Sequence, residues 1–403
     1  MSTHQQTFLV PMTDPNRPIY LDCAATTPID QRVRDIVMHY MDVEFGNAGS
    51  RTHIYGQEAA KGVKKARAQI AAVVDASPAE IIFTSGATES NNLAILGLTE
   101  YGQREGKRHI ISTQIEHKAV LEPLQHLAHR GFDIELVAPS RDGRISAESI
   151  KRRLRDDTLL VSVMHVNNEI GVTQPIDEIA DALRKHSAIL HVDAAQGFCK
   201  DSATLRNRRI DMISASGHKL YAPKGIGTLI MRRDRKVSRC VKPLLYGGGQ
   251  ERGLRSGTLA TPLICGLGAA AEIALNEAPR WRVIWDKRRA ELLDAFSATS
   301  PTIIGSSVHK LGNIISFALP GIDADALILT IKPYISISNT AACTSSRQDT
   351  SHVLDAIGLE ADLKEQVCRA SFCHLTPAIP VQEIKYALRQ FTNQDHTHQA
   401  MSS

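Results

Sequence analysis

Ser214-Ala215-Ser216-Gly217-His218-Lys219 follows the apolar run 210–213, which predicts a short buried strand that ends where Ser216 begins. Lys219 would then stand at the end of that strand. A lysine amine attacks a carbonyl only when it is unprotonated, so a catalytic lysine needs a partly desolvated pocket or a covalent imine. The hydroxyl, glycine amide and imidazole donors beside it suit a phosphate. The stretch therefore points to pyridoxal phosphate on Lys219, and the alternative is a surface turn with a solvated lysine.

The bulk properties limit the class of protein. At 403 residues the chain exceeds one ordinary core, which predicts two domains, and its 43% hydrophobic residues fit a globular protein. The 47 basic and 43 acidic residues leave a formal net charge of +4, which gives no electrostatic sign of direct nucleic-acid binding. No apolar stretch approaches membrane-spanning length, and the polar N-terminus lacks a signal-peptide layout. We expect a cytoplasmic protein without a membrane partner.

Short apolar runs alternate with amphipathic segments between residues 81 and 231, which is typical of a mostly parallel sheet. The predicted strands are 81–83, 109–111, 134–137, 159–164 and 189–192, and helices are predicted over 147–154 and 176–186. From about residue 278 a helix is predicted over 281–296, with strands over 313–318 and 334–338. The sequence thus predicts an α/β fold with a large domain, 30–275, that carries a mostly parallel mixed sheet. Residues 1–29 and 276–403 would form a smaller α+β domain.

Polar residues follow several of the predicted strands. Ser85-Gly86-Ala87-Thr88 leads into an apolar helical run, and a small-residue turn at a helix N-terminus presents free amides to a phosphate. An ordinary N-cap is the alternative. Asp193 closes another buried strand, where an ionised aspartate is costly unless it meets a cation. A protonated pyridine nitrogen would be that cation and would keep the ring electron-withdrawing, whereas a helix cap is the alternative.

Further polar positions fit the same cofactor. His117 could stack on the ring and move protons because imidazole titrates near neutrality, although most of the 16 histidines must do neither. Asn168 ends a predicted strand and offers an amide to a ring oxygen. The glycine run 247–249 and Arg255-Ser256-Gly257-Thr258 add flexible backbone and anion donors, which is weak evidence alone.

The cysteines are scattered and odd in number, without paired metal-ligand spacing, so we expect neither a disulfide scaffold nor a metal site. They are Cys23, Cys199, Cys240, Cys265, Cys343, Cys368 and Cys373. Most would be small buried hydrophobes in a reducing compartment, and Cys23, Cys240 and Cys265 are expected to be inert. Cys343 differs because its neighbours are small and polar, which predicts an exposed, mobile loop. A nucleophilic thiol needs that access and a lowered pKa.

Together these motifs resemble the cysteine desulfurases of the fold-type I, class V aminotransferase-like group. The resemblance covers Tyr20-Leu21-Asp22, Gly46-Asn47, 84–92, 115–118, 165–171, 191–196, 216–227, 247–258 and 342–345. It implies the large-domain and small-domain fold of pyridoxal-phosphate transferases. It also implies conversion of L-cysteine to L-alanine, with a persulfide left on the enzyme for a sulfur-acceptor protein.

The resemblance also implies a role for each matched residue. Lys219 would hold the cofactor and remove the α-proton, His117 would stack on the ring, and Cys343 would accept the sulfur. The cofactor would be bound by Lys219, Asp193, Gln196, Ala87, Thr88, Asn168, Ser216 and His218, with Thr258 from the neighbouring subunit of a homodimer. Arg369 would bind the substrate carboxylate, assisted by Asn47.

Three segments depart from the family pattern. Ser371-Phe372-Cys373-His374-Leu375-Thr376 replaces the frequent Ser-Leu-Gly-Arg-Phe-Thr, which leaves the packing beside the substrate open. Ser338-Asn339-Thr340-Ala341-Ala342 replaces a lead-in richer in serine and glycine. The segment 46–53 is closer to desulfurases that supply DNA phosphorothioation, while the serine-rich segment around Cys343 is similar to the housekeeping branch of iron–sulfur assembly. Those two pathways and thio-modification of RNA stay open as destinations of the sulfur.

Two other classes of function also stay open. A selenocysteine lyase or another class V aminotransferase-like enzyme would keep Lys219, Asp193 and His117 but would not need a persulfide on Cys343. A non-catalytic scaffold for sulfur relay would keep the fold alone, and the presence of Lys219 argues against it.

Overall fold

The structure is a computed structural model that describes residues 14, 16–234, 237–339 and 351–401, with side chains described as far as Phe391 in the last helix. Cys343 lies outside the described residues. Within the part that is described, no helix combines the length and apolar character needed to cross a bilayer.

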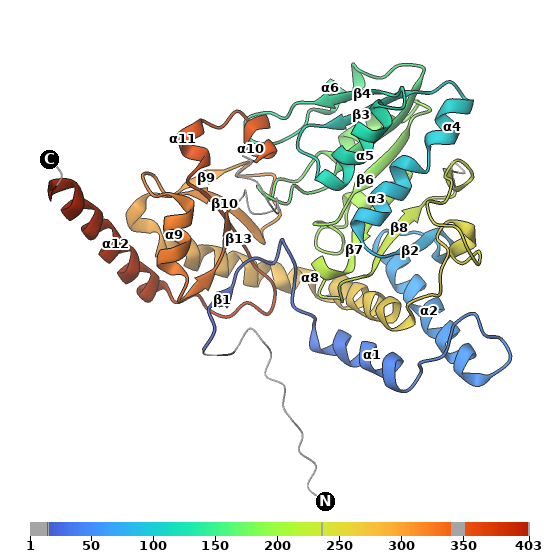
Figure 1. Cartoon of the computed structure of the whole chain (residues 1–403), viewed down its shortest axis with the longest axis horizontal. Helices are drawn as coiled ribbons and strands as arrows, with labels where there is room; N and C mark the ends of the chain where they lie inside the picture. The colour runs from blue at the N-terminus through green and yellow to red at the C-terminus, as the bar shows by residue number, and fades with distance from the viewer. Residues whose placement is uncertain (1–13, 15, 235–236, 340–350, 402–403) are drawn as a thin grey trace, which may run out of the picture.

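A seven-stranded sheet forms the centre of the larger part of the molecule, in the order β2-β8-β7-β6-β5-β3-β4 (Figure 1). Its strands are β2 (Ile81–Thr84), β3 (His109–Thr113), β4 (Asp133–Val137), β5 (Thr158–Met164), β6 (Ile189–Asp193), β7 (Met212–Ser216) and β8 (Gly227–Met231). The strands from β4 to β7 are parallel, and β8 is antiparallel to both of its neighbours. The predicted α/β fold with a mostly parallel mixed sheet is confirmed.

Successive side chains of these strands point to opposite faces of the sheet and pack into two apolar cores, one on each face. Ile82 and Leu160 pack into one core, whereas Ile81 and Val161 pack into the other. A strand that is buried on both faces consists of consecutive apolar residues. The positions of these strands could therefore be predicted from the sequence. The helices of this part are α1 (Gln31–Asp42), α2 (Ile54–Val73), α3 (Ala87–Leu96), α4 (Thr99–Arg104), α5 (Lys118–Ala128), α6 (Ala147–Lys151), α7 (Ile176–Ala182) and α8 (Thr261–Ala295).

A smaller antiparallel sheet has the order β12-β13-β10-β9, and α8 runs from the larger part of the molecule to it (Figure 1). Its strands are β9 (Thr302–Ile304), β10 (Ile314–Ala318), β12 (Ser338–Asn339) and β13 (Val367–Ser371), and its helices are α9 (Ala324–Ile331), α10 (His352–Ala356), α11 (Ala361–Lys364) and α12 (Val381–Met401). Near the N-terminus, β1 (Ile19–Tyr20) pairs with β11 (Ile335–Ser336). The division into domains at residues 29/30 and 275/276 stays a prediction.

Several element boundaries differ from the sequence prediction. The strand before Lys219 begins at Met212 and includes Ser214 to Ser216, because β6 and β8 on either side provide backbone partners along it. The helix predicted from residue 281 begins twenty residues earlier, at Thr261, and continues through Pro279. Its buried face carries the small residues of its first half and then Trp281 and Trp285, so packing along its length outweighs the local cost of the proline. The predicted helices 147–154 and 176–186 are shorter, and the predicted strand 334–338 divides into β11 and β12 of two different sheets.

Candidate active site

A cavity of about 520 Å³ lies where the parallel strands β5, β6 and β7 end. Because their carboxyl ends meet at one edge of the sheet, polar residues that are distant in sequence converge there. Among the predicted site residues, the cavity is lined by Ala87, Thr88, His117, Asn168, Asp193, Gln196, Ser216, His218, Lys219 and Arg369.

Two predicted residues lie elsewhere. Asn47 and Thr258 are exposed and do not line this cavity. The Asn47 side chain accepts a hydrogen bond from the Gly49 amide at 2.9 Å, which closes a turn between α1 and α2. Within one chain, therefore, neither Asn47 nor Thr258 is part of the cavity wall that contains Arg369.

The start of α3 lies in the cavity wall and has the features that suit an anion. Its N-cap residue, Gly86, makes no side-chain capping bond, so no cap occupies the first amides at the positive dipole end of the helix, where Ala87 and Thr88 line the cavity. A Cβ atom on Gly227 of β8 would lie 2.5 Å from Gly86 Cα, so only glycine permits this approach. Burial and the Lys219 charge lower the pKa of His218 to about 4, which leaves a neutral imidazole beside this site at pH 7.

Lys219 belongs to a short 3-10 turn, Gly217–Lys219, directly after β7. Thr27, from the segment before α1, holds the turn: its amide and hydroxyl both donate to the His218 carbonyl oxygen, at 2.8 and 2.9 Å. The same hydroxyl accepts from the Tyr221 amide at 2.9 Å, where Tyr221 has a left-handed backbone with φ 60°. Strain of this kind persists only where the surroundings impose it, and it clusters at functional sites.

Asp193 lies at the end of β6, where it is 6% exposed. Among the described residues its hydrogen-bond partners are neutral: Asn91 Nδ2 donates to Oδ2 at 2.7 Å, and the Ala195 amide donates to Oδ1 at 2.9 Å. Such a carboxylate is set up to receive a cationic N–H from a ligand. Sequence reasoning missed Asn91, although it stands within the matched segment 84–92 and one helical turn after Thr88.

His117 is the N-cap of α5, and its Nδ1 accepts from the Ala119 amide at 3.0 Å. In the neutral ring the proton therefore stands on Nε2. Burial and the nearby Lys219 charge lower the pKa of His117, which favours that neutral form. The preceding residue, Glu116, is fully enclosed, and burial raises the pKa of its carboxyl to about 8.

Arg369 extends from β13 into the cavity wall and is 1% exposed. One guanidinium nitrogen pairs with Asp22 Oδ1 at 2.6 Å, and the other donates to the Asn168 carbonyl oxygen at 3.0 Å. These two contacts hold the Arg369 guanidinium, a cation, at the end of the cavity where the smaller sheet forms the wall. A carboxylate ligand can meet it there.

The donor set fits pyridoxal phosphate. The cavity combines uncapped helix amides, a buried aspartate and a lysine, the groups that a phosphate, a pyridinium and an aldehyde require. Gln196 adds a buried Oε1 atom that has no hydrogen-bond partner among the described residues, while its Nε2 donates to the Ala24 carbonyl oxygen at 2.8 Å. The described residues contain no cluster able to hold a metal ion.

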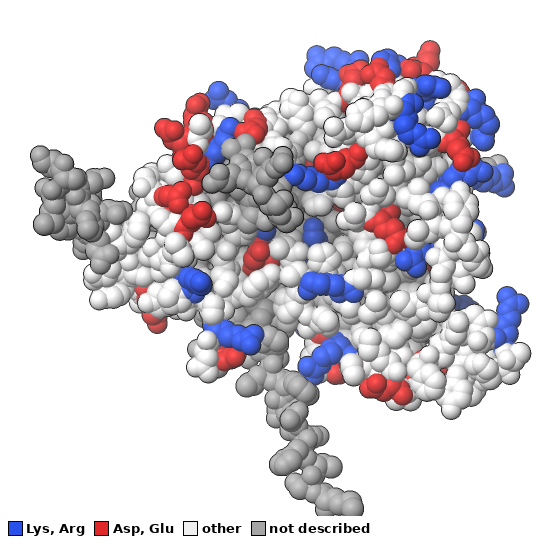
Figure 2. All heavy atoms as spheres, viewed as in Figure 1, with Lys and Arg blue, Asp and Glu red and all other residues white. Residues whose placement is uncertain are grey.

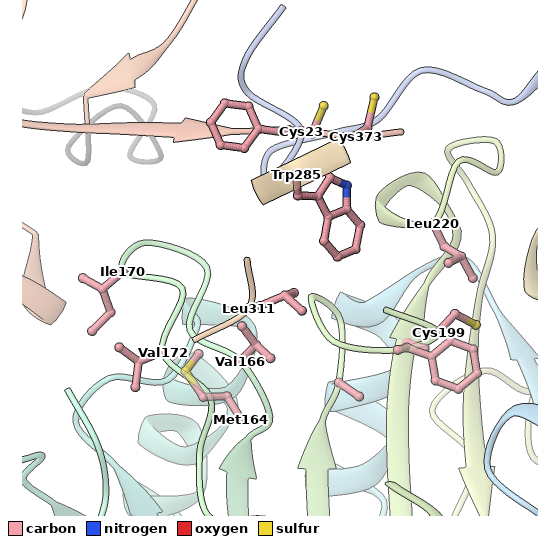
Figure 3. Packing of buried hydrophobic residues seen from close by; sticks show 14 of the residues in the cluster. Cys23, Met164, Val166, Ile170, Val172, Cys199, Leu220, Trp285, Leu311 and Cys373 are labelled. Atoms are coloured by element: carbon pink, nitrogen blue, oxygen red, sulfur yellow. The ribbon is translucent and has the colours of Figure 1, made fainter. Parts of the chain in front are cut away.

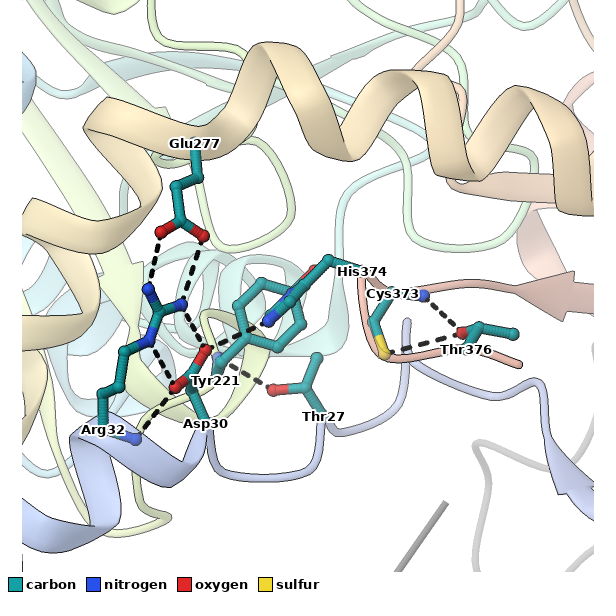
Figure 4. Close-up of polar contacts among 8 residues, drawn as sticks. All are labelled: Thr27, Asp30, Arg32, Tyr221, Glu277, Cys373, His374 and Thr376. Carbon is teal, nitrogen blue, oxygen red and sulfur yellow. Dashed lines mark hydrogen bonds and ion pairs between the residues drawn. The ribbon is translucent and has the colours of Figure 1, made fainter. Parts of the chain in front are cut away.

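The segment 371–376, which departs from the family pattern, takes part in a polar network beside the site (Figure 4). His374 Nε2 bonds to Asp30 Oδ2 at 3.1 Å, and its ring lies 4.5 Å from the Trp281 ring and 4.4 Å from the Tyr221 ring. Asp30 also caps α1 and pairs with Arg32. The histidine at position 374 thus joins the end of β13 to α1 and α8.

Cys23 and Cys373 lie side by side above Trp285 of α8, and both are fully buried (Figure 3). Thr376 Oγ1 donates to the Cys373 sulfur at 3.5 Å. Five of the six described cysteines are buried, Cys240 is half-buried, and none lines the cavity.

Comparison with known proteins agrees with this site. Residues 19–384 match the model of the family described as Aminotransferase class-V. The chain is 42% identical over 373 residues to the mitochondrial cysteine desulfurase of Drosophila melanogaster, covering 92% of this chain and 79% of that protein. It is 41% identical over 378 residues to the cysteine desulfurase IscS of Shewanella sp. (strain ANA-3), covering 93% and 92%.

A solved structure described as DndA from Streptomyces lividans superposes with a TM-score of 0.77 and 50% identity, covering 88% of this chain and 99% of that one. The chain belongs to the class-V aminotransferase family and, within it, to the pyridoxal-phosphate-dependent cysteine desulfurases.

Proposed function

We propose that this enzyme converts L-cysteine to L-alanine and retains the sulfur as a persulfide on Cys343. When bound, pyridoxal phosphate supplies an electron-withdrawing ring that stabilises negative charge at the substrate α-carbon. Lys219 would hold that group and move the α-proton. Asp193 would pair with its ring nitrogen, and the start of α3 would bind its phosphate. Arg369 would bind the carboxylate of cysteine.

The neutral His117 side chain supports a role in proton transfer. Its Nε2 carries the proton, and its Nδ1 is held by the Ala119 amide, so the ring has a fixed orientation in the cavity wall. The Cys343 thiolate would attack the sulfur of the bound cysteine. The sulfur–sulfur bond forms as the carbon–sulfur bond breaks, the electron pair of the broken bond stays with the substrate carbon, and that carbon takes up a proton to give alanine.

The observation that carries the choice of Cys343 is that none of the six described cysteines lines the cavity. Burial raises the pKa values of most of them, namely Cys199, Cys240, Cys265 and Cys368, and a hydrogen bond to Cys373 together with burial raises that of Cys23. Hydrogen bonds from Cys23 and Thr376 lower the pKa of Cys373 to about 7 against the effect of burial, but this thiol is fully enclosed. The seventh cysteine is the remaining candidate.

The position of the chain just before Cys343 supports the same proposal. Ser338 of β12 stands opposite Arg369 of β13, a residue of the cavity wall. Cys343 is the fifth residue after Ser338, and five extended residues span at most roughly 18 Å.

The test uses the purified protein with pyridoxal phosphate, L-cysteine and a reductant. Equal amounts of alanine and sulfide are expected, and Cys343→Ala should abolish both while cofactor absorption persists. Cys240→Ala is the matched control and should behave as wild type. Alanine formed at the wild-type rate by Cys343→Ala would instead favour a selenocysteine-lyase or aminotransferase-like reaction.

A homodimer is part of this proposal. The end of α1 and the start of α2 expose a group of large apolar side chains, among them Phe45 at 64% and Tyr55 at 49%, whose rings stack 5.4 Å apart. In Figure 2 this region carries few charged side chains, whereas the end around β4 and α6 is crowded with both signs. Exposed apolar patches of this kind mark interfaces, and a second subunit would bring its Thr258 to the phosphate.

Sedimentation measurements test the dimer. Phe45→Asp should shift the protein toward monomers, whereas Val283→Asp, at a position 69% exposed on α8, should not. A monomeric wild-type protein that still binds the cofactor tightly would refute the proposed role of Thr258.

For the sulfur acceptor, we propose a protein of a DNA-phosphorothioation system. The segment 46–53, which resembles that branch, and the 50% identity to the protein named DndA support this choice. Transfer of radiolabelled sulfur from the persulfide form to purified acceptors would test it. Transfer to an iron–sulfur scaffold protein alone would refute it.

A further inference from the structure

Glu89 places a negative charge in the part of the cavity wall where the phosphate is expected. It is the third residue of α3 and lines the cavity together with Ala87 and Thr88. Its Oε2 accepts from the Ser85 amide at 2.7 Å, so the carboxylate also closes the turn before the helix. An acidic residue in the first turn of a helix is favourable for the helix dipole. The same charge repels a phosphate that binds at that end of the helix.

Arg255 is the cation that pairs with this carboxylate. Its Nε donates to Glu89 Oε1 at 2.9 Å, and its Nη2 lies 3.5 Å from Oε2. Within the described part of the chain, Glu89 has no other ion-pair partner. Burial raises the pKa of Glu89, but hydrogen bonds from Arg255 and Ser85 outweigh this effect and hold the pKa below its usual value. The carboxylate is therefore ionised at pH 7, and its charge is balanced by Arg255.

The backbone that carries Arg255 is held in place by a second acidic residue. Glu251, four residues earlier, is 6% exposed, and its carboxylate accepts from the Phe83 amide at 2.7 Å and pairs with Arg67. Phe83 belongs to β2, the strand that leads into α3. Ion pairs between long side chains near solvent contribute little, because the side chains lose freedom when they pair. Here the segment is already fixed on β2, so Arg255 loses less freedom when it meets Glu89.

We propose that Arg255 is a positioning residue for the cofactor phosphate and acts by neutralising Glu89, an inference that rests on the proposed binding of the phosphate at the start of α3. The sequence predicts an anion donor at position 255, but the guanidinium is bonded to Glu89 and does not line the cavity. Its effect on the phosphate therefore passes through the charge of Glu89. Loss of Arg255 should weaken the binding of a ligand that carries a phosphate, and neutralising Glu89 should cancel that loss.

Titration of the full-length apoenzyme with pyridoxal phosphate, and with pyridoxal, which lacks only the phosphate, tests this through the absorption of the bound ligand. Arg255→Gln should weaken the binding of pyridoxal phosphate about 10-fold, or about 1.4 kcal/mol, and leave the binding of pyridoxal unchanged. Glu89→Gln keeps an oxygen acceptor for the Ser85 amide and should bind pyridoxal phosphate at least as tightly as wild type. The double variant Glu89→Gln/Arg255→Gln should return to the wild-type affinity, and Arg255→Lys, which keeps the charge, should retain most of it.

Arg184→Gln is the matched control for net charge, because this exposed arginine pairs with Asp181 of α7 and does not line the cavity. It should change neither affinity.

A double variant as weak as Arg255→Gln would overturn the inference, because Arg255 would then act on the phosphate itself. An equal loss of pyridoxal binding in Arg255→Gln would also overturn it, because the role would then be structural. If Arg255→Gln does not fold, Glu89→Gln decides the matter, since a 10-fold loss of pyridoxal-phosphate affinity in that variant would refute the repulsion. Failure of the underlying proposal is recognised separately: a wild-type protein that binds pyridoxal as tightly as pyridoxal phosphate holds no phosphate at α3, and the inference would fall with that proposal.

Discussion

Replacing Asp30 by alanine should destabilise the protein by roughly 3 kcal/mol. The carboxylate is 4% exposed, accepts from the Arg32 amide at 3.0 Å as the N-cap of α1, and bonds His374 Nε2 at 3.1 Å. Loss of the cap costs about 1 kcal/mol. The His374 donor, enclosed between the Trp281 and Tyr221 rings, would be left unpaired at a cost of about 1–3 kcal/mol. The pair with Arg32 adds at most about 1 kcal/mol because that side chain is half exposed.

The assay is urea unfolding of the holoenzyme at fixed pyridoxal phosphate, followed by the fluorescence of Trp281 and Trp285, the two tryptophans of the chain. Asp30→Ser keeps a capping oxygen and should recover about 1 kcal/mol. Asp35→Ala removes a carboxylate of the same helix that is 63% exposed and should cost less than about 0.5 kcal/mol. An Asp30→Ala variant as stable as Asp35→Ala would refute the reasoning.

The same carboxylate predicts a dependence on pH. Burial alone would raise the pKa of Asp30, but hydrogen bonds from His374 and Arg32 lower it well below its usual range. The folded pKa lies below the unfolded value of about 3.9, so the stabilisation is present above that pH and is lost as the pH falls further. The difference in stability between wild type and Asp30→Asn should therefore shrink between pH 5 and pH 3.

Three further predictions concern the cavity and the core. Asn91→Leu removes the donor to Asp193 and should weaken pyridoxal-phosphate binding about 10-fold, measured by titration of the apoenzyme; unchanged affinity would show that Asp193 needs no such support. Gly227→Ala places a methyl group 2.5 Å from Gly86 Cα and should weaken binding of the cofactor and of inorganic phosphate alike, because it displaces the start of α3. Burial lowers the pKa of His191 to about 4, so the unfolded chain binds a proton below about pH 6.5 that the folded chain does not. Stability should fall by about 1.4 kcal/mol per pH unit from this group between pH 6.5 and 4, and His191→Asn should remove that slope in urea unfolding; an unchanged slope would count against it.

Much of the fold and of the candidate site was predictable from the sequence, because parallel strands that are buried on both faces consist of consecutive apolar residues. Each run ends in polar residues, and the carboxyl ends of such strands meet at one edge of the sheet. Asp193, Ser216 and Lys219 could therefore be placed together from sequence. The start of α3 was also predictable from local sequence. Small residues before an apolar helix leave the first backbone amides of that helix free to bind a ligand.

Only the tertiary structure decided which neighbours support these groups. The bond from Asn91 to Asp193, the contact of Arg255 with Glu89 and the position of His374 against Asp30 join residues 102 to 344 positions apart. The continuation of α8 through Pro279 likewise depends on packing. Local sequence encodes the backbone preference of each segment and the polarity of its ends. It does not encode which distant side chain satisfies a buried donor or acceptor, because that choice is made when the elements pack.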